Sequence, residues 1–281
     1  MTPWFYFVVL IEAPVLLLAA YLGGWWLYLL LALVALMGMG ELYSALIARG
    51  MRPDAGVGYL CGLLLMAAAQ FAPAEYAAEL MIFCVFLTVA GSLGAQFSRT
   101  GREDTLRDAA MTALGVIYIP LLLSYVFLLC KMDLPLILTG QSGGPVKARL
   151  GALLIVAAAA WISDTAAWAI GHLWGRRKLT PSLSPNKTVE GALAGGVAAV
   201  LSVLLVGWWV GLPAHHGLIL GVLLAFATQI GDLAASVVKR SLKLKDFGTV
   251  LGPHGGMLDT FDGFLFAAPV TWFYIWFFLM P

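Results

Sequence analysis

The chain has 281 residues, of which 62% are hydrophobic and 11% are charged. An ordinary soluble domain carries about 25% charged residues, so this composition indicates that lipid is the solvent for most of the chain. The 16 basic and 15 acidic residues leave a net charge of +1, which argues against a nucleic-acid partner or an acidic tail. The three cysteines form no C-x-x-C pair and therefore give no sign of a metal or redox site.

Nine apolar stretches are long enough to cross a bilayer as helices, which takes about 20 residues. In chain order they are 4–21, 25–47, 55–71, 74–97, 109–130, 149–174, 189–210, 215–239 and 258–280. The first begins without a basic region or a cleavage site, which predicts a span and not a removable signal peptide. Only Gly23 and Gly24 separate the first two stretches, so eight and ten spans are alternatives. Because the stretches lack the alternation of barrel strands, we predict an all-α polytopic membrane protein.

The basic residues predict the orientation, because cytoplasmic loops collect Lys and Arg. One set of alternate connections holds 13 of them and the opposite set holds 3. The first set is Arg49, Arg52, Arg99, Arg102, Arg107, Arg176, Arg177, Lys178, Lys187, Lys239, Arg240, Lys243 and Lys245; the second is Lys131, Lys147 and Arg149. The split predicts a cytoplasmic N-terminus. Residues 131–148 are predicted to form one exposed connection, which divides N-terminal scaffold and dimerisation helices (1–148) from a C-terminal catalytic region (149–281).

The most polar stretch between two apolar spans runs from Gln229 to Gly263. A charge at the centre of a membrane helix costs about 2.5–3.5 kcal/mol on insertion scales, so such residues usually mark function. On a continuing helix Asp232, Ser236, Lys239 and Lys243 would share one face, which suits a metal-bound polyphosphate. The alternative for Asp232 is a buried ion pair between helices.

A glycine-rich turn at residues 252–256 (GPHGG) follows, and adjacent glycines allow backbone N–H groups to approach a phosphate. Asp259 and Asp262 come next, three residues apart on one helix face. Together with Asp232 and the neighbouring bases, they are the groups that metal-assisted phosphoryl or nucleotidyl transfer requires. The alternatives are a helix N-cap with its N3 partner for the two aspartates, an ordinary positive-inside flank for the lysines, and a turn residue for His254.

A second polar block begins at Asp164, which lies in an apolar run where an unpaired carboxylate is penalised. Residues 184–188 (SPNKT) predict a helix start with Pro near its first position, and Lys178 and Lys187 flank the turn. The alternative is a plain cytoplasmic loop with a capped helix. Residues 186–188 also fit the N-glycosylation pattern, which the predicted cytoplasmic face makes a false match.

The two blocks resemble the phosphatidate cytidylyltransferase family. The first match is S-x-x-K-R-x4-K-D-x-G-x4-P-x-G-G followed by D-x-x-D, from Ser236 to Asp262; the second is D-T-A-A-W-x-x-G and K-L-T-P-x-x-S-P-N-K-T-x-E-G, between Asp164 and Gly191. The resemblance implies a helical membrane enzyme with a polar, cytoplasm-facing active-site cavity. It also implies that a phosphate oxygen of phosphatidic acid attacks the α-phosphorus of CTP, giving CDP-diacylglycerol and pyrophosphate.

The resemblance further implies roles for individual residues. The catalytic residues would be Asp232, Asp259, Lys239, Arg240 and His254. The phosphates would be bound by Lys178, Ser184, Lys187, Lys245, Gly255 and Gly256. Asp232 and Asp259, supported by Asp262 and Asp246, would hold Mg²⁺, alone or with a second divalent or monovalent cation. The implied partners are CTP, phosphatidic acid or a related lipid phosphate, membrane lipid and a second copy of the chain, in a bacterial-type inner (plasma) membrane.

One position departs from the family pattern, because Thr260 stands where Asp-Arg-x-Asp is usual. Losing an Arg removes a charge-assisted contact worth about 1.5–3 kcal/mol. A paralogue that acts on another phosphorylated lipid therefore stays open, as does another CTP-dependent lipid enzyme such as a polyprenol kinase. Outside the enzymes, the alternatives are a secondary transporter or a lipid-binding scaffold, since intramembrane carboxylates also serve ion coupling.

Overall fold

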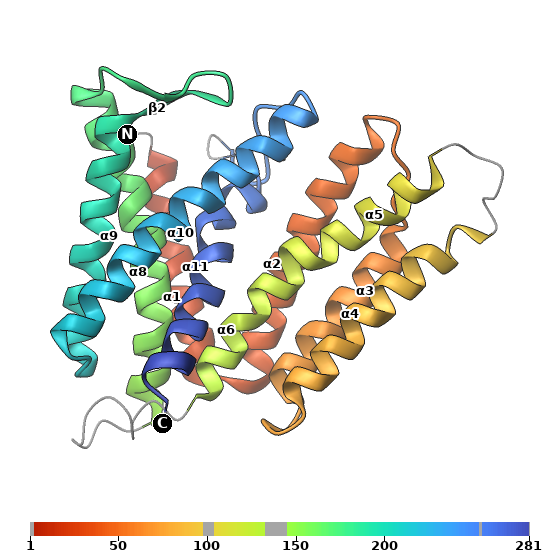
Figure 1. Ribbon diagram of the computed structural model, residues 1–281, viewed down its shortest axis with the longest axis horizontal. Helices are drawn as coiled ribbons and strands as arrows, with labels where there is room; N and C mark the ends of the chain where they lie inside the picture. Colours follow the sequence, from red (N-terminus) through yellow and green to blue (C-terminus); the bar gives the residue numbers. More distant parts are fainter. Residues whose placement is uncertain (1–2, 98–103, 133–144, 253–254, 281) are drawn as a thin grey trace. The chain divides into compact units, whose positions relative to one another are not determined.

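The computed structural model describes residues 3–97, 104–132, 145–252 and 255–280 (Figure 1). Its helices are α1 (Pro3–Leu22), α2 (Gly24–Ile47), α3 (Ala55–Phe71), α4 (Ala77–Gly94), α5 (Thr105–Val116), α6 (Leu122–Lys131), α8 (Pro145–Trp174), α9 (Val189–Val210), α10 (Ala214–Ser241) and α11 (Met257–Phe278). The π-helical turn η2 (Ile117–Leu121) joins α5 to α6 and contains Pro120. Strands β1 (Lys178–Thr180) and β2 (Ser184–Thr188) form an antiparallel hairpin.

The helices correspond to the nine apolar stretches, which confirms the all-α polytopic architecture. Within the described residues, seven helical segments are long and apolar enough to span a membrane. They are Gly24–Ile47, Ala77–Gly94, Thr105–Lys131, Leu150–Trp174, Val189–Val210, Ala214–Ser241 and Met257–Phe278. Ile11–Leu22 and Ala55–Phe71 are shorter apolar helices. The count of nine spans and the orientation stay predictions.

The chain forms two compact units. Unit 1 comprises Met1–Glu12, Leu22–Leu128 and Leu242–Thr260, and unit 2 comprises Ala13–Tyr21, Leu129–Ser241 and Phe261–Pro281. The polar segment after α10 and the first turn of α11 therefore pack with helices α2–α6, although both are distant from those helices in the sequence. The predicted division of roles at residue 148 stays a prediction.

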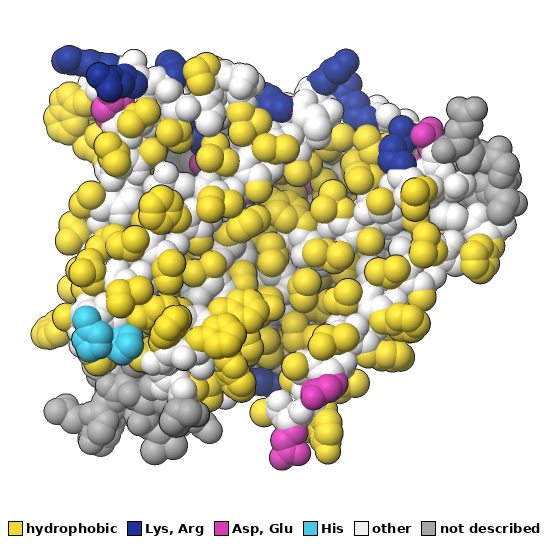
Figure 2. All heavy atoms as spheres, viewed as in Figure 1, with side chains coloured by type: hydrophobic (Ala, Val, Ile, Leu, Met, Phe, Trp, Pro, Cys, Tyr) yellow, Lys and Arg dark blue, Asp and Glu magenta, His cyan; other side chains and the backbone are white. Residues whose placement is uncertain are grey.

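Large hydrophobic side chains are exposed on the helices of each unit, as Figure 2 shows. Examples are Trp25 and Phe86 in unit 1 and Trp208, Phe226 and Phe277 in unit 2. Soluble monomers rarely expose so much contiguous apolar surface, whereas the surface of a membrane protein that contacts lipid tails is apolar. The exposed apolar faces therefore identify a multi-pass membrane protein.

In unit 1, α2 packs against α3 and α5 around the buried ring of Tyr43. Its hydroxyl donates to the Thr112 carbonyl at 2.8 Å. Gly58 and Gly115 lie against the ring, because an added Cβ would be 2.2 Å and 2.4 Å from the Tyr43 hydroxyl oxygen. This packing fixes α2 on the helices around it, and α2 in turn contacts the polar segment described below.

In unit 2, glycines bring the helix backbones close together. A Cβ added at Gly191, Gly195, Gly221 or Gly231 would lie less than 3.0 Å from backbone atoms of the neighbouring helix. Small residues at such contacts are typical of membrane helices, since association there depends on close van der Waals packing. Gly231 matters most for the site, because it sets α10 directly against α11.

Two local predictions were wrong. Residues 184–188 form β2 and not a helix start; α9 begins at Val189, where the Thr188 hydroxyl accepts from Gly191 N at 3.1 Å as the N-cap. A two-stranded hairpin consists of edge strands, which tolerate a proline without an N–H at position 185. The predicted connection 131–148 also ends earlier than expected, because α8 begins at Pro145. Residues 133–144 lie outside the described part of the chain.

The predicted continuous face from Asp232 to Lys243 was also wrong at its end. Helix α10 stops at Ser241, and Lys243 has a φ of 52°, in the left-handed region that residues other than glycine rarely adopt. Asp232, Ser236 and Lys239 share the helix, but Lys243 lies beyond it.

Candidate active site

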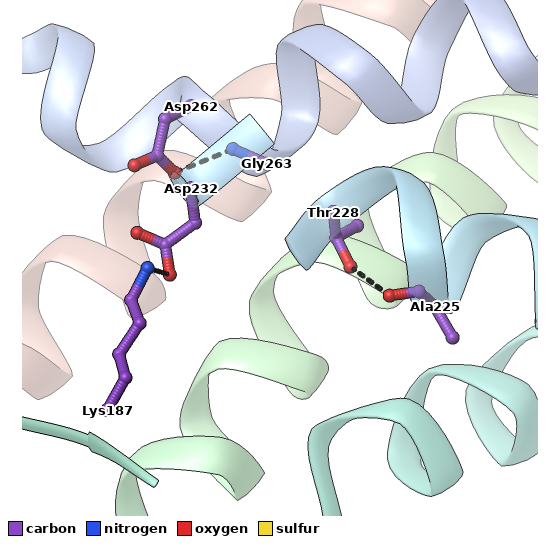
Figure 3. Close-up of polar contacts among 6 residues, drawn as sticks. All are labelled: Lys187, Ala225, Thr228, Asp232, Asp262 and Gly263. Atoms are coloured by element: carbon purple, nitrogen blue, oxygen red, sulfur yellow. Dashed lines mark hydrogen bonds and ion pairs between the residues drawn. The ribbon is translucent and has the colours of Figure 1, made fainter. Parts of the chain in front are cut away.

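Four charged side chains from four elements of unit 2 lie together, and we call them the acidic–lysine cluster. They are Asp164 of α8, Lys187 of β2, Asp232 of α10 and Asp262 of α11. The Lys187 ammonium group forms an ion pair with Oδ2 of Asp232 (Figure 3). Asp262 interacts electrostatically with Asp232, Asp164 and Lys239, and Asp164 interacts with Asp232 and Lys187. Three predicted site residues, Lys187, Asp232 and Asp262, are thus brought together.

The contact between α10 and α11 positions the two carboxylates of this cluster that Figure 3 shows. Because Gly231 has no side chain, the α10 backbone approaches the Asp262 carbonyl; an added Cβ would lie 2.4 Å from that oxygen. Asp232 follows directly in the sequence and therefore lies beside α11. Asp262 is only 5% exposed, and its Oδ1 accepts from Gly263 N at 2.6 Å. One turn before Asp232, the Thr228 hydroxyl bonds within its own helix, to the Ala225 carbonyl at 3.4 Å.

The cluster carries an excess of negative charge. Asp164, Asp232 and Asp262 face two ammonium groups, Lys187 and Lys239. Carboxylates this close repel one another in a low-dielectric interior, so an additional proton or cation stabilises the group. The side chains of Asp232 and Lys187 keep 31% and 25% of their surface exposed, although the Lys187 ammonium nitrogen itself is buried.

The donor set fits a hard cation such as Mg²⁺. Among the described residues, no group of three or more His, Cys, Asp or Glu side chains is arranged as a ready metal site. Mg²⁺ does not need one, because it is typically held by one or two carboxylates while waters and substrate phosphates complete its shell. Asp232 and Asp262 would supply such a pair, and the Lys187 ammonium group is the cation that Asp232 contacts in this structure.

The β1–β2 hairpin is fixed at both ends. The Glu190 carboxylate, in the first turn of α9, accepts from the backbone N–H groups of Arg176 and Arg177 at 3.0 Å and 3.2 Å. Arg240 Nε donates to the Leu183 carbonyl at 2.8 Å, which ties the hairpin turn to α10. Figure 2 shows Lys and Arg side chains gathered at the end of unit 2 that carries the hairpin.

The predicted phosphate-binding residues of the hairpin differ in their surroundings. Lys178 is exposed on β1, and Ser184 is half-buried at the start of β2. Only Lys187 reaches into the acidic–lysine cluster. Arg240, predicted to be catalytic, is exposed on α10 and holds the hairpin through its backbone contact. Lys239 lies one residue earlier and interacts with Asp262.

Asp259 lies in unit 1, at the start of α11, where its carboxylate orders the chain. Its Oδ2 accepts from Phe247 N at 2.8 Å and from Gly256 N at 2.9 Å. Because α11 begins at Met257, Asp259 is the third helical residue and reaches back to the residue before the helix, as the N3 residue of a capping box does. Gly255 has a φ of 91°, and a Cβ there would lie 2.6 Å from Asp259 Oδ2, so the turn requires glycine.

The other predicted residues of this segment have less defined surroundings. Lys245 and Asp246 are exposed, Gly255 and Gly256 are buried, and His254 lies outside the described residues. That Asp232 and Asp259 hold cations together stays a prediction, since the two residues belong to different units.

Sequence reasoning gave no role to two carboxylates that the structure places at important contacts. Asp164 lies in an apolar run, where burying its ionised carboxylate costs free energy, and it belongs to the acidic–lysine cluster. Glu41, in the apolar run of α2, accepts from Met257 N at 2.8 Å and from Leu258 N at 2.9 Å. The cost of an intramembrane carboxylate is the signal that points to both residues.

Comparisons with known proteins agree with this architecture. The pattern of the cytidylyltransferase family matches residues 6–278. The chain is 30% identical over 273 residues to the phosphatidate cytidylyltransferase of Synechocystis sp., covering 90% of this chain and 89% of that protein. It is 43% identical over 123 residues to that of Brucella suis, covering 43% of this chain and 46% of the relative, and 41% identical over 116 residues to that of Bacillus subtilis, covering 40% and 43%. The chain belongs to the cytidylyltransferase family, and it is therefore a membrane-embedded transferase.

Proposed function

We propose that this enzyme transfers the cytidylyl group of CTP to phosphatidic acid, giving CDP-diacylglycerol and pyrophosphate for phospholipid biosynthesis. The observation that carries the proposal is the acidic–lysine cluster, in which carboxylates from three helices meet a lysine from the hairpin. Carboxylates that hold a cation and bases that hold phosphates are the requirements of this reaction. The similarity to a relative of that name along nearly the whole chain supports the choice of substrates.

In this proposal Asp232 and Asp262 would hold Mg²⁺, with Asp164 beside them. When bound, Mg²⁺ would neutralise charge on the triphosphate and on the departing pyrophosphate. Lys187, which forms an ion pair with Asp232, would bind a phosphate oxygen of the nucleotide, and Lys239 would bind the same phosphates. A new bond forms between a phosphatidic acid oxygen and the α-phosphorus while the bond to the β-phosphate oxygen breaks. The attacking phosphate is already ionised at neutral pH, so this step needs no general base.

We also propose that the enzyme lies in the inner (plasma) membrane of a bacterial-type cell, with its N-terminus and site on the cytoplasmic side. The support is the accumulation of Lys and Arg in alternate connections, and the basic hairpin beside the acidic–lysine cluster. A homodimer remains a proposal that rests on the family resemblance alone.

The test is a reconstituted reaction. Purified protein in detergent is incubated with labelled CTP, Mg²⁺ and phosphatidic acid, and the labelled lipid product is measured. Product that forms only when all three are present supports the proposal. A parallel series with other lipid phosphates tests the paralogue alternative, which Thr260 motivates. Absence of product with every lipid, together with ion-driven uptake into liposomes, would contradict the enzymatic function and indicate a transporter.

A further inference from the structure

We propose that Glu41 and Arg49 are positioning residues, which hold the two ends of the segment between α10 and α11 and so orient Asp259. The inference rests on the proposed function, and on the role as a metal ligand in the same reaction that the family resemblance implies for Asp259. Both come from α2 or the turn that follows it, in the half of the chain that sequence analysis treated as scaffold. We call the described residues 242–252 and 255–258, which run from the end of α10 into the first turn of α11, the connecting segment; they belong, with Glu41 and Arg49, to unit 1.

Glu41 holds the far end of the connecting segment. Its Oε1 accepts from Met257 N at 2.8 Å and its Oε2 from Leu258 N at 2.9 Å. These are the first two amides of α11, and the first amides of a helix have no partner within the helix. Asp259 Oδ2 takes the preceding amide, of Gly256. Two carboxylates thus share the start of α11, where negative charge is also favoured by the helix dipole.

The fit around Glu41 is close. A Cβ added at Gly248 would lie 2.6 Å from its Oε1, and one added at Gly256 would lie 2.3 Å from its Oε2. The backbone of the connecting segment therefore approaches the carboxylate from two sides. Phe247, next to Gly248, donates its N–H to Asp259 at 2.8 Å. A shift of Glu41 would consequently move both the helix start and the backbone group that fixes Asp259.

Arg49 holds the near end of the connecting segment. Its Nε donates to the Leu242 carbonyl at 2.5 Å, and its Nη2 donates to the Lys243 carbonyl at 3.1 Å. These carbonyls follow Ser241, the last residue of α10, where orphan carbonyls and the negative end of the helix dipole favour a cation. Lys243, whose carbonyl accepts this bond, has a φ of 52°, in the left-handed region.

The two residues have complementary chemistry. Glu41 only accepts hydrogen bonds and meets N–H groups at a helix start, whereas Arg49 only donates and meets carbonyls after a helix end. They lie eight positions apart in the sequence, Glu41 within α2 and Arg49 in the turn after its last residue, Ile47. The connecting segment carries Lys245 and Asp246 and leads to Asp259, and its two ends are held by α2 and by the turn that follows α2.

The experiment on Glu41 compares Glu41→Ala and Glu41→Gln with wild type in detergent. We measure kcat and KM for CTP per folded molecule, and amide hydrogen exchange of the connecting segment. Glu41→Ala is expected to lower kcat about 10²-fold, since small displacements of catalytic groups cost that much, while KM changes little. Exchange at residues 257 and 258 should become faster. Glu41→Gln should lie between, because its amide oxygen accepts one N–H and its NH₂ group accepts none.

The matched control for Glu41 is Glu79→Ala, which removes an exposed carboxylate from the first turn of α4 and should leave kcat and exchange unchanged. For Arg49, Arg49→Ala should lower kcat and speed exchange at residues 242–248, and Arg49→Lys should recover part of both. Its control is Arg107→Ala, which breaks a surface ion pair with Asp104.

The outcomes distinguish failure of the positioning role from failure of the proposed function. A residue with only a stabilising role would lower the amount of folded protein and leave kcat per folded molecule at the wild-type value; that result would overturn the positioning role. Unchanged exchange in the connecting segment of Glu41→Ala would overturn it as well. If the wild-type protein makes no cytidylyl lipid, the proposed function fails, and the positioning of Asp259 for that reaction fails with it. Faster exchange in the variants would then show only that Glu41 and Arg49 hold the connecting segment.

Discussion

Lys187 of β2 forms an ion pair with Asp232 of α10, joining a hairpin residue to a carboxylate in a membrane-spanning helix. Asp262 and Asp164 lie within electrostatic range of this pair. The lysine therefore supplies a positive charge beside Asp232 and Asp164, carboxylates that would otherwise repel one another. Removing it tests directly whether these carboxylates hold a divalent cation.

Lys187→Met should strengthen the binding of a divalent cation in the absence of nucleotide. The substitution removes a competing charge from Asp232, and at an effective dielectric of about 20 a neighbouring unit charge is worth about 4 kcal/mol at 4 Å. Allowing for partial compensation, we expect the dissociation constant for Mn²⁺, measured by electron paramagnetic resonance, to fall about tenfold. Mn²⁺ should also raise the unfolding temperature of the variant more than that of wild type, because only the folded state binds it.

The control for this experiment is Lys178→Met, which removes an exposed lysine of the same hairpin from a position outside the acidic–lysine cluster. Its affinity for Mn²⁺ should equal that of wild type. An affinity that falls in Lys187→Met would mean that the lysine supports the cation site and does not compete with the cation.

Asp232→Asn should lower cytidylyl transfer by about 10³-fold, because a lost metal ligand costs several kcal/mol of transition-state stabilisation. Asn keeps the size of the side chain, so the variant should remain a folded membrane protein. The measurement is kcat with phosphatidic acid, alongside size-exclusion chromatography in detergent. Asp104→Asn is the control, since Asp104 is 60% exposed in a surface ion pair with Arg107 and should be dispensable. Activity retained in Asp232→Asn would remove this residue from the metal site.

Gly231→Ala should destabilise the protein and lower its activity. Its new Cβ would lie 2.4 Å from the Asp262 carbonyl oxygen, so α10 must move away from α11. Overpacking of this kind costs about 1–3 kcal/mol, and the movement separates Asp232 from Asp262. The unfolding temperature in detergent and kcat check both effects.

Gly263→Ala is a matched control for this contact. Gly263 lies on the facing helix, but a Cβ there would be no closer than 3.5 Å to Thr228, an ordinary van der Waals distance. The control should behave like wild type in stability. Equal losses in the two variants would show that any added methyl group at this contact is harmful and that Gly231 has no special place.

The membrane helices could be predicted from the sequence because each depends on its own apolar residues, and about 20 such residues define a span. Asp232 could be found in the same way, since a carboxylate in an apolar run needs an explanation. The hairpin was missed because Pro185 near a capping Thr188 is compatible with a helix start as well as with an edge strand. Local pattern alone does not decide between those two structures.

The contacts that fix the connecting segment could not be predicted, because they join distant parts of the chain. Arg49 and Leu242 are 193 positions apart, and Glu41 and Met257 are 216 positions apart. No local periodicity encodes such pairs. Arg49 contacts carbonyls just beyond the end of α10, where the local pattern predicted that the helix continues to Lys243. Asp259 likewise has its position set by Phe247 N, a backbone group that every residue except proline supplies.

Thr260→Arg should raise activity on phosphatidic acid. Thr260 occupies the position where the family pattern has Arg, and its hydroxyl donates to the Gly256 carbonyl at 3.3 Å. Replacing it breaks that bond, at a cost of about 0.5–1.5 kcal/mol, and adds a guanidinium group that can bind a phosphate bidentately. We expect the gain as a lower KM for the lipid, measured with labelled CTP across a series of lipid phosphates.

The control is Thr260→Val, which removes the same hydroxyl without adding a charge. It should lose a little stability and gain no activity, so a gain in the arginine variant alone isolates the effect of the cation. If Thr260→Arg has no effect with any lipid phosphate, position 260 does not contact substrate phosphate. If it improves the reaction with phosphatidic acid while weakening that with another lipid, the threonine has retuned the site for that other lipid, because a bound guanidinium favours the more highly charged phosphate.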